Sequence, residues 1–205
     1  MDFRQKLEGW EFGGDRMSLA VRLAKGRRVL HVGCVDEGMA SRETLHHKLD
    51  KVCKVLIGVD TAPRGIEFAG SFPKREFFDL DFQIHRWRFD IPAALDLVVC
   101  TEVLEHLDAV GPFLRNLRSV GARAYLFTVP NAFSEQHAEY IGGTAGCPTA
   151  ECAELVHPDH RCWFSPYTLE NCLKHAGYTP IERWMVGRER PASLFRAEGV
   201  AILCE

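Results

Sequence analysis

Short apolar runs alternate along the chain with segments whose apolar positions recur at helical spacing. Five runs have the length and the content of valine, leucine and phenylalanine that favour buried strands, at residues 28–32, 52–59, 76–81, 97–100 and 124–129. Helices are expected between them at residues 40–49, 63–69 and 112–119, and after them at residues 166–176. This alternation is typical of a mostly parallel sheet with helices on both faces.

The two ends of the chain and one internal segment depart from this alternation. Residues 178–186 and 199–204 are strand-like runs with no helix between them, which predicts a terminal antiparallel hairpin. Residues 1–26 are weakly periodic, and we expect a helical extension there. Residues 131–160 are irregular and rich in glycine, alanine and threonine, and a loop of this length usually serves a functional site. The pattern predicts one α/β domain over residues 1–205, with this loop on its substrate side.

The stretch from residue 96 to residue 107 changes its period half-way along. It begins as an apolar strand and continues with Glu102, Glu105 and His106 at spacings i, i+3 and i+4. A helix through these three positions would place their side chains on one face. Because open α/β sheets bind ligands at the carboxyl ends of their strands, we expect a group-transfer site here.

Composition narrows the classes of partner and compartment. The chain has 205 residues and a formal charge of −3, so nothing global favours nucleic acid or an anionic membrane as a partner. No apolar run approaches the roughly 20 residues that span a bilayer, and the first residues lack the apolar core of a signal peptide. Several of the eight cysteines lie in strand-like runs, where reduced cysteine packs as a small hydrophobe. We therefore expect a cytoplasmic protein with no membrane partner.

Four segments, in this order and spacing, resemble the motifs of class I S-adenosylmethionine-dependent methyltransferases, over residues 27–205. VLHVGC at 29–34 resembles the first strand with its glycine turn, and VLIGVD at 55–60 resembles the second strand with its terminal acid. DLVVCTEVLEHL at 96–107 is very similar to the fourth-strand signature of the ubiquinone-type group (methyltransferase type 11), and FTVPN at 127–131 resembles the end of the fifth strand. The resemblance implies a Rossmann-like, seven-stranded, mostly parallel sheet with helices on both faces and a C-terminal antiparallel hairpin.

The resemblance also implies S-adenosyl-L-methionine as the cofactor and assigns residues to it. Gly33 would let the backbone approach the nucleoside, and the amides after it would receive the methionine carboxylate. Asp60 would accept hydrogen bonds from the ribose hydroxyls, and Asp79 or Asp81 would accept one from the adenine amino group. The full set of cofactor-binding residues implied in this way is His31, Gly33, Cys34, Asp60, Thr61, Asp79, Asp81, Thr101, Glu102 and Val103.

The glycine turn departs from the pattern of this family. Members usually have an acid at the position of His31 and glycines at the positions of Val35 and Glu37, whereas this chain keeps Gly33 and offers Gly38. The loop is therefore expected to follow a different path. The departure motivates one alternative, a cofactor-binding, methyltransferase-like protein without turnover. A second alternative, a nicotinamide-dependent oxidoreductase, lacks the early Gly-x-Gly-x-x-Gly fingerprint.

A divalent metal is a further candidate cofactor. The Glu-x-x-Glu-His run resembles that of the ubiquinone-pathway enzymes and of the small-RNA 3′-terminal 2′-O-methyltransferases, two groups that bind such an ion. HPDHRCWFSP at 157–166 also resembles a segment of the small-RNA enzymes, so His160 would complete a set with Glu102, Glu105 and His106. Two carboxylates and two imidazoles suit Mg²⁺, Mn²⁺ or Co²⁺, which would hold adjacent hydroxyls and lower the pKa of the attacking one. Without a metal, His106 would serve as a general base or as a structural group.

The leading hypothesis is O-methylation of a small-molecule or glycan-like acceptor, with His106, Glu105 and His160 as the catalytic residues. The alternative is a metal-assisted RNA 2′-O-methyltransferase, for which the slightly acidic chain lacks the basic surface that phosphate contacts favour. A structural zinc in the long loop is a separate candidate, although its ligands match no tight zinc spacing: Cys147, Cys152, His157, His160 and Cys162. The sequence identifies neither the acceptor nor an oligomeric state.

Overall fold

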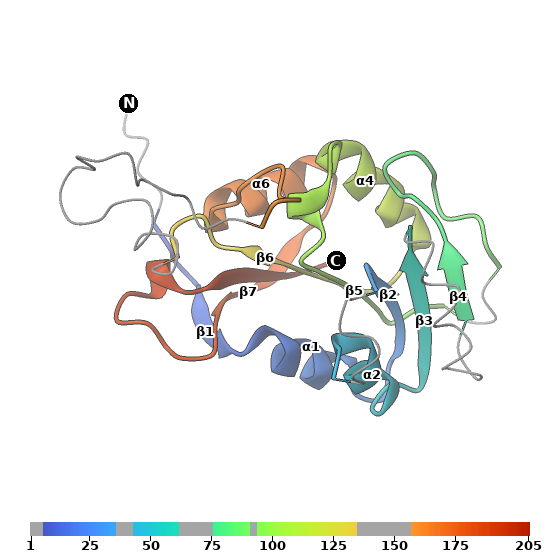
Figure 1. Cartoon of the computed structure of the whole chain (residues 1–205), viewed down its shortest axis with the longest axis horizontal. Helices are drawn as coiled ribbons and strands as arrows, with labels where there is room; N and C mark the ends of the chain where they lie inside the picture. Colours follow the sequence, from blue (N-terminus) through green and yellow to red (C-terminus); the bar gives the residue numbers. More distant parts are fainter. Residues whose placement is uncertain (1–5, 36–42, 62–75, 91–93, 135–156) are drawn as a thin grey trace.

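A computed structural model describes residues 6–35, 43–61, 76–90, 94–134 and 157–205, and it contains one mixed sheet between two layers of helices (Figure 1). The eight strands lie in the order β1-β7-β8-β6-β5-β2-β3-β4. Their bounds are β1 (Glu11–Gly14), β2 (Arg28–Val32), β3 (Val55–Asp60), β4 (Glu76–Asp79), β5 (Leu97–Thr101), β6 (Tyr125–Pro130), β7 (Pro180–Val186) and β8 (Gly199–Cys204). The described helices are α1 (Arg16–Ala24), α2 (Leu45–Asp50), α4 (Val110–Leu117) and α6 (Pro166–His175), with 3₁₀ turns η2 (Leu104–His106), η3 (Arg118–Val120) and η4 (Leu194–Arg196).

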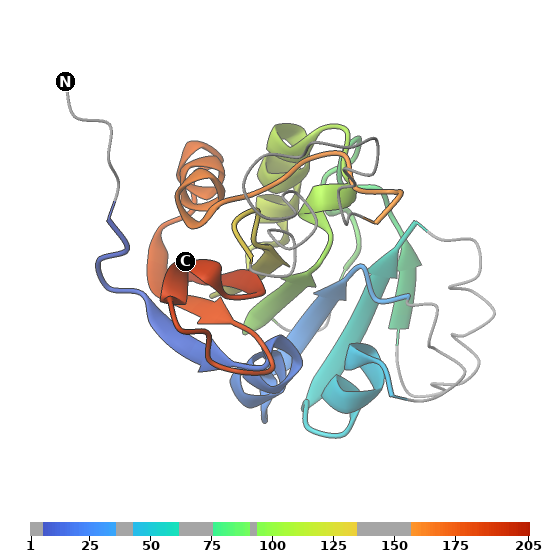
Figure 2. The same ribbon diagram turned by 60° about the vertical axis from the view of Figure 1, so that its left-hand side comes forward.

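Helices cover both faces of the sheet (Figures 1 and 2). On one face α1 and α2 contribute Leu19 and Leu49 to a buried cluster that includes Val99. On the other face α4 contributes Leu114 to a cluster that includes Val98. Because Val98 and Val99 are neighbours in β5, alternate side chains of one strand belong to the two layers. This burial on both sides explains why the strands have continuous apolar sequences rather than alternating ones.

The strand order reverses at the centre of the sheet. β2 lies between β3 and β5 and is parallel to both, and β5 is parallel to β6. β8 runs antiparallel to both β6 and β7, which confirms the predicted terminal hairpin. The expected Rossmann-like α/β fold is thus confirmed. The reversal places a crevice outside the carboxyl ends of β2 and β5, where open sheets of this kind bind their ligands.

An ion pair joins the opposite, amino ends of the two central strands. Asp96 Oδ2 accepts hydrogen bonds from the backbone N of Arg28 at 2.9 Å and from its Nε at 3.0 Å. Asp96 Oδ1 accepts a third from Arg28 Nη2 at 3.0 Å. These hydrogen bonds hold the pKa of the Asp96 carboxyl below its ordinary value. The pair therefore fixes β2 beside β5 at the edge away from the crevice.

The N-terminal extension is not wholly helical, and this corrects the expectation of seven strands. Glu11–Gly14 forms β1, an eighth strand that pairs in parallel with β7 at the edge of the sheet. Two of its four residues are glycine, which weakens the sequence signal of a strand. A Cβ on Gly13 would lie 2.9 Å from Trp184 Cβ, so the close approach to β7 requires glycine. The expected helix follows as α1, with the Asp15 side chain as its cap.

The prediction of a helix across residues 102–106 is wrong. Among these residues only the 3₁₀ turn η2 forms. Glu102 has φ of 53°, a left-handed backbone conformation that an α-helix does not contain. Glu102, Glu105 and His106 therefore do not share one helix face. Leu104, between them, is buried in the core.

The remaining helix predictions differ in outcome. The helix expected at 166–176 is confirmed as α6, which begins with a capping box between Ser165 and Thr168. The helix expected at 40–49 is shorter, because α2 begins at Leu45 with Thr44 as its cap. The helix expected at 63–69 and most of the loop at 131–160 lie outside the described residues. None of the described helices combines the length and apolarity needed to cross a bilayer.

Candidate active site

The carboxyl ends of β2, β3 and β5 meet at a cavity of about 400 Å³. Gly33 follows β2, Asp60 ends β3 and Glu102 follows β5, and all three residues line this cavity. The cavity lies at the reversal of strand order, the position at which sheets of this type bind nucleotides. Three positions far apart in the sequence thus share one crevice.

The turn after β2 requires glycine and is tied to β3. Gly33 has φ of 70°, and a Cβ there would lie 2.5 Å from Val103 Cγ2. The backbone N of Gly33 donates to Val59 O at 2.9 Å, and that of Val35 donates to Asp60 Oδ2 at 2.8 Å. The Asp60 carboxylate therefore faces the turn, and its hydrogen bond holds the loop against the end of β3.

The cavity has an apolar wall beside a second carboxylate. Asp81 lines the cavity, and its Oδ1 accepts a hydrogen bond from the backbone N of Gln83 at 2.8 Å. Asp79, the other candidate for an adenine contact, is exposed and does not line the cavity. The apolar wall consists of Val32, Val59, Leu80, Phe82, Val103, Leu107 and Phe113. This combination suits the flat face and polar edge of a nucleobase.

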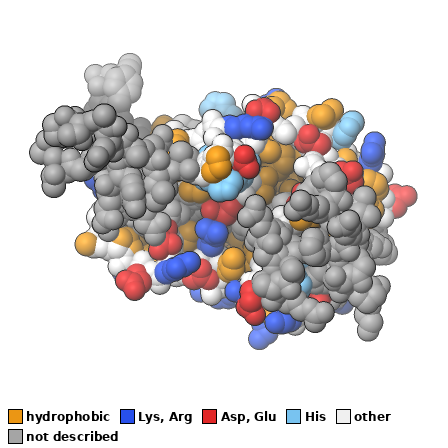
Figure 3. Space-filling model, viewed as in Figure 1, with side chains coloured by type: hydrophobic (Ala, Val, Ile, Leu, Met, Phe, Trp, Pro, Cys, Tyr) orange, Lys and Arg blue, Asp and Glu red, His pale blue; other side chains and the backbone are white. Residues whose placement is uncertain are grey.

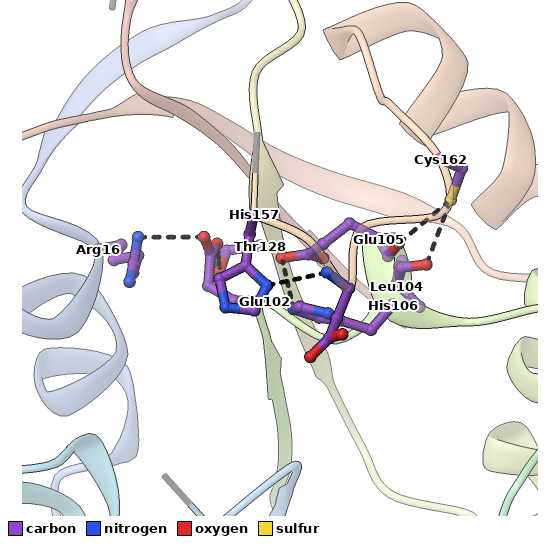
Figure 4. A network of polar contacts seen from close by, with 9 residues as sticks. Arg16, Glu102, Leu104, Glu105, His106, Thr128, His157 and Cys162 are labelled. Carbon is purple, nitrogen blue, oxygen red and sulfur yellow. Dashed lines mark hydrogen bonds and ion pairs between the residues drawn. The ribbon is translucent and has the colours of Figure 1, made fainter. Parts of the chain in front are cut away.

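Glu102 is held by partners from two other elements (Figure 4). Arg16 Nη1 donates to Glu102 Oε2 at 3.0 Å, and Thr128 Oγ1 donates to Glu102 Oε1 at 2.9 Å. Arg16 is the first residue of α1, so the N-terminal segment reaches the site across the ends of the central strands. The positive φ of Glu102 is thus kept in place by hydrogen bonds to both carboxylate oxygens.

A second cavity, of about 540 Å³, adjoins the first and shares Gly33, Glu102 and His106 with it. Two of its lining residues, His31 and His46, are buried and place their Nδ1 atoms 3.1 Å apart. Burial, with the neighbouring imidazole of His46, lowers the pKa of His31 well below its ordinary value. Burial therefore disfavours a positive charge on His31, and across this contact the Nδ1–H of one ring donates a hydrogen bond to Nδ1 of the other.

Three further imidazoles gather at the same cavity. The rings of His106 and His160 have centroids 4.7 Å apart, and that of His157 lies 5.6 Å from His106. One ring nitrogen from each lies within 4.8 Å of the others. The segment that carries His157 and His160 is fixed against η2, because Glu105 O accepts the backbone N–H of Arg161 at 2.7 Å.

Glu105 is the most buried carboxylate of the site. Its side chain lines the second cavity, and the residue is 1% exposed. Neither carboxylate oxygen has a hydrogen-bond partner among the described residues, and Oε1 lies 3.9 Å from His106 Nε2 (Figure 4). Burial, and next the negative charge of Glu102, raise the pKa of Glu105 to about 8.

A family model described as "Methyltransferase domain" matches residues 10–183, which is most of the chain. The chain belongs to this family. No curated protein matches it in sequence. The described fold and the family together confirm the resemblance to class I S-adenosylmethionine-dependent methyltransferases.

Solved structures similar to this methyltransferase share its fold at low sequence identity. An S-adenosylmethionine-dependent methyltransferase from Mesorhizobium loti has a TM-score of 0.59 and 13% identity, covering 92% of this chain and 97% of that one. The N-methyltransferase NodS from Bradyrhizobium japonicum, in complex with S-adenosyl-L-homocysteine, has a TM-score of 0.56 and 18% identity, covering 92% and 84%. A methyltransferase from Aquifex aeolicus has a TM-score of 0.57 and 14% identity, covering 93% and 89%.

Nearly all of the residues predicted for the site of the methyltransferase line its two cavities. The first is lined by Gly33, Asp60, Thr61, Asp81, Glu102, Val103 and His106. The second is lined by His31, Gly33, Cys34, Thr101, Glu102, Glu105, His106 and His160. Asp79 lies outside both linings. The catalytic and cofactor-binding roles of these residues stay predictions.

Sequence reasoning missed Arg16 and His46 and named His157 only as a candidate ligand of a structural zinc, although all three line the second cavity of the methyltransferase. Arg16 lies 86 positions before Glu102, and no local pattern connects the two. His157 did offer a signal, because it stands three residues before His160. On the face shown in Figure 3, histidine and acidic side chains gather near the middle, beside hydrophobic ones.

Proposed function

We propose that this methyltransferase transfers a methyl group from S-adenosyl-L-methionine to a hydroxyl oxygen of a neutral small-molecule or glycan-like acceptor. The supporting observation is the pair of adjoining cavities that share Gly33, Glu102 and His106. The first has the apolar wall and carboxylates that suit a nucleoside. The second has imidazoles and a buried carboxylate, which are proton acceptors suited to activating a hydroxyl.

In this proposal the first cavity holds the adenosine part of the cofactor. Asp60 accepts hydrogen bonds from the ribose hydroxyls, and Asp81 accepts one from the adenine amino group. Arg16 and Glu102 bind the methionine end, because their opposite charges complement its carboxylate and its ammonium group. On cofactor binding, the ion pair between Arg16 and Glu102 is thus replaced by two ion pairs, one from each side chain to the cofactor.

The acceptor occupies the second cavity beside His106. Its hydroxyl oxygen attacks the methyl carbon of the sulfonium from the side opposite sulfur. The new C–O bond forms as the C–S bond breaks, S-adenosylhomocysteine leaves, and the hydroxyl proton passes to an imidazole nitrogen of His106. Glu105, whose Oε1 lies 3.9 Å from His106 Nε2, stabilises the resulting imidazolium when its carboxyl is ionised. Alignment of oxygen, carbon and sulfur supplies much of the rate, because the reactants meet in one fixed geometry.

A neutral acceptor fits the charges of the second cavity. The single Lys or Arg among its described lining residues is Arg16, which already pairs with Glu102 at 3.0 Å. Arg161, which lines the first cavity, pairs with Asp108 at 2.7 Å. An acceptor rich in phosphate, such as RNA, would meet carboxylates here instead of the cations it requires.

The proposal includes a divalent ion as a second, optional component of the site. Of the four residues implied by the sequence resemblance, Glu102 does not fit, because both of its oxygens accept hydrogen bonds from Arg16 and Thr128. His106 and His160 fit, and His157 lies beside them. When bound, such an ion would lower the pKa of an acceptor hydroxyl near His106.

Calorimetric titration of the chain with S-adenosylhomocysteine tests the cofactor half of the proposal. We expect saturable binding, and at least tenfold weaker binding by Asp60→Asn, which loses charge-assisted hydrogen bonds to the ribose. Glu182→Gln, an exposed change on β7, is the matched control and should bind as the wild type does. Absence of binding at millimolar ligand would contradict the proposal.

Methyl transfer from labelled S-adenosylmethionine to a panel of hydroxylated acceptors tests the other half. We expect transfer to a neutral hydroxyl compound and its loss in His106→Asn, with cofactor affinity retained. Transfer to amines alone would refute the choice of acceptor atom. Cofactor binding with no transfer across the panel would support the alternative of a binding protein without turnover.

A further inference from the structure

We propose that His106, His157 and His160, with Glu105 beside them, form a nitrogen-rich site for a transition-metal ion of the Zn²⁺ or Co²⁺ class. The proposal rests on the proposed function for its role: the ion would lie where the acceptor binds, and with His106 as its ligand instead of the proton acceptor it would lower the pKa of the attacking hydroxyl. Its binding can be measured without any methyl transfer. It differs in its ligands from the set implied by the sequence, which contained two carboxylates and two imidazoles and suited Mg²⁺, Mn²⁺ or Co²⁺.

The geometry of the three imidazoles is the first observation. One ring nitrogen of each residue lies within 4.8 Å of the other two. Ligand nitrogens of tetrahedral zinc, with bonds of about 2.0–2.1 Å, lie roughly 3.4 Å apart, so closure around an ion needs side-chain shifts on the order of 1 Å. His157 is exposed and His106 and His160 are half-buried, which leaves room for such shifts.

The three ligands come from two segments that are fixed to each other. His157 and His160 belong to one turn, in which the backbone N of His160 donates to His157 O at 3.0 Å. The residues after this turn hydrogen-bond to η2, which contains His106: Cys162 Sγ donates to Leu104 O at 3.4 Å (Figure 4). The site is therefore assembled by the fold, and only the side chains must adjust on binding.

The buried carboxylate of Glu105 is the second, independent observation. The residue is 1% exposed, and neither of its oxygens has a hydrogen-bond partner among the described residues. A buried polar group without a partner is costly, and a buried carboxylate is more costly still. Its Oε1 lies 3.9 Å from His106 Nε2, on the same cavity as His157 and His160. A cation at the three imidazoles would supply the positive charge that this carboxylate lacks.

Ligand chemistry selects the class of ion. Neutral imidazole is a borderline ligand that suits zinc, cobalt and nickel, whereas magnesium prefers carboxylate, carbonyl and water oxygens. Glu102, the carboxylate that would have favoured magnesium, is engaged by Arg16 and Thr128. Three nitrogen ligands with an open fourth position, next to a cavity, are the arrangement of catalytic rather than structural zinc.

Metal titration of the full chain tests this assignment. Chelator-treated protein would be titrated calorimetrically with ZnCl₂ and with MgCl₂, and the Co²⁺-loaded protein would be examined by visible absorption. We expect one Zn²⁺ per chain, no saturable Mg²⁺ binding, and a Co²⁺ spectrum with nitrogen ligands in a low-coordinate geometry. The unfolding midpoint should rise with Zn²⁺, because a ligand of the folded state stabilises that state.

Three variants separate the proposed ligand set from the one implied by the sequence. His157→Ala should weaken Zn²⁺ binding at least tenfold, whereas Glu102→Gln should leave it unchanged. His175→Ala, a change of an exposed histidine on α6, is the control for loss of an imidazole elsewhere. Equal unfolding midpoints of metal-free wild type and His157→Ala would show that the variant folds, as expected for an exposed side chain.

Some outcomes would overturn the site. They are no Zn²⁺ or Co²⁺ binding, binding unaffected by His157→Ala, or Mg²⁺ binding lost in Glu102→Gln. Titration of the metal-free protein with S-adenosylhomocysteine keeps the two proposals apart. Zn²⁺ binding without cofactor binding would refute the methyl transfer and leave the metal site, and the reverse result would do the opposite.

Discussion

Replacement of Gly33 by alanine should separate the cost of a left-handed backbone from the cost of a steric clash. Gly26 is a matched control. Both glycines have φ of 70°, and both donate their backbone N–H to a carbonyl oxygen at 2.9 Å. They differ in surroundings: a Cβ at Gly33 would lie 2.5 Å from Val103 Cγ2, whereas a Cβ at Gly26 would have nothing within 4 Å.

The magnitudes follow from these two environments. Alanine in a left-handed conformation costs about 1–2 kcal/mol. Alanine also lowers the conformational entropy of the unfolded chain, which offsets about 0.4–1 kcal/mol of that cost. Gly26→Ala should therefore lower the free energy of unfolding by about 1 kcal/mol. Gly33→Ala should cost about 1–3 kcal/mol more, because the added Cβ forces the Val103 side chain out of its packed position in the cavity wall.

Urea denaturation of both variants measures the difference, and a third variant tests its cause. In a Val103→Ala background the clashing Cγ2 is absent, and the remaining Val103 Cβ would lie 3.8 Å from the added atom, an ordinary contact. The cost of Gly33→Ala should then fall to that of Gly26→Ala, a coupling of about 1–3 kcal/mol. Equal costs for the two glycine variants, or no rescue by Val103→Ala, would refute the steric reasoning.

Two further predictions concern charged groups. Arg16→Ala should weaken S-adenosylhomocysteine binding about tenfold by calorimetry, because one charge-assisted contact is lost. Arg22→Ala, an exposed change on the same helix, should leave the affinity unchanged. Equal affinities of wild type and Arg16→Ala would remove Arg16 from the cofactor site. The ion pair of Glu170 with Arg183 lowers the pKa of Glu170 to about 2, so its stabilisation is complete above the ordinary value of 4.5 and is lost as pH falls towards 2. Glu170→Gln should therefore lower the free energy of unfolding by about 1–2 kcal/mol at pH 6 and by less near pH 2.5, and a difference independent of pH would contradict this account.

The sequence was most informative where burial on both faces of the sheet dictates residue type. Val98 and Val99 point to opposite layers, so β5 has to be apolar throughout, and such runs can be recognised without a structure. Gly33 and Asp60 were predictable for a related reason. Each ends a buried strand, and the ends of adjacent parallel strands necessarily meet at one edge of the sheet.

The sequence was least informative where distant segments meet. The spacing of Glu102, Glu105 and His106 fits a helix, but the local pattern contains no sign that Glu102 adopts a left-handed conformation held by Arg16 and Thr128. That conformation depends on tertiary partners, which override a local periodicity. β1 was not predicted for a similar reason. A four-residue strand with two glycines acquires its structure by pairing with β7.

The pairing of β1 with β7 has a practical consequence for anyone who shortens this chain for expression. All four recognisable motifs begin after residue 27, so a boundary chosen from the motifs would discard β1 and α1. Such a fragment would keep every signature residue of the family. It would nevertheless expose the unpaired backbone edge of β7, to which a strand of another molecule could pair. It would also lack the guanidinium of Arg16 that meets Glu102, so poor solubility and weak cofactor binding would appear together and have a single origin.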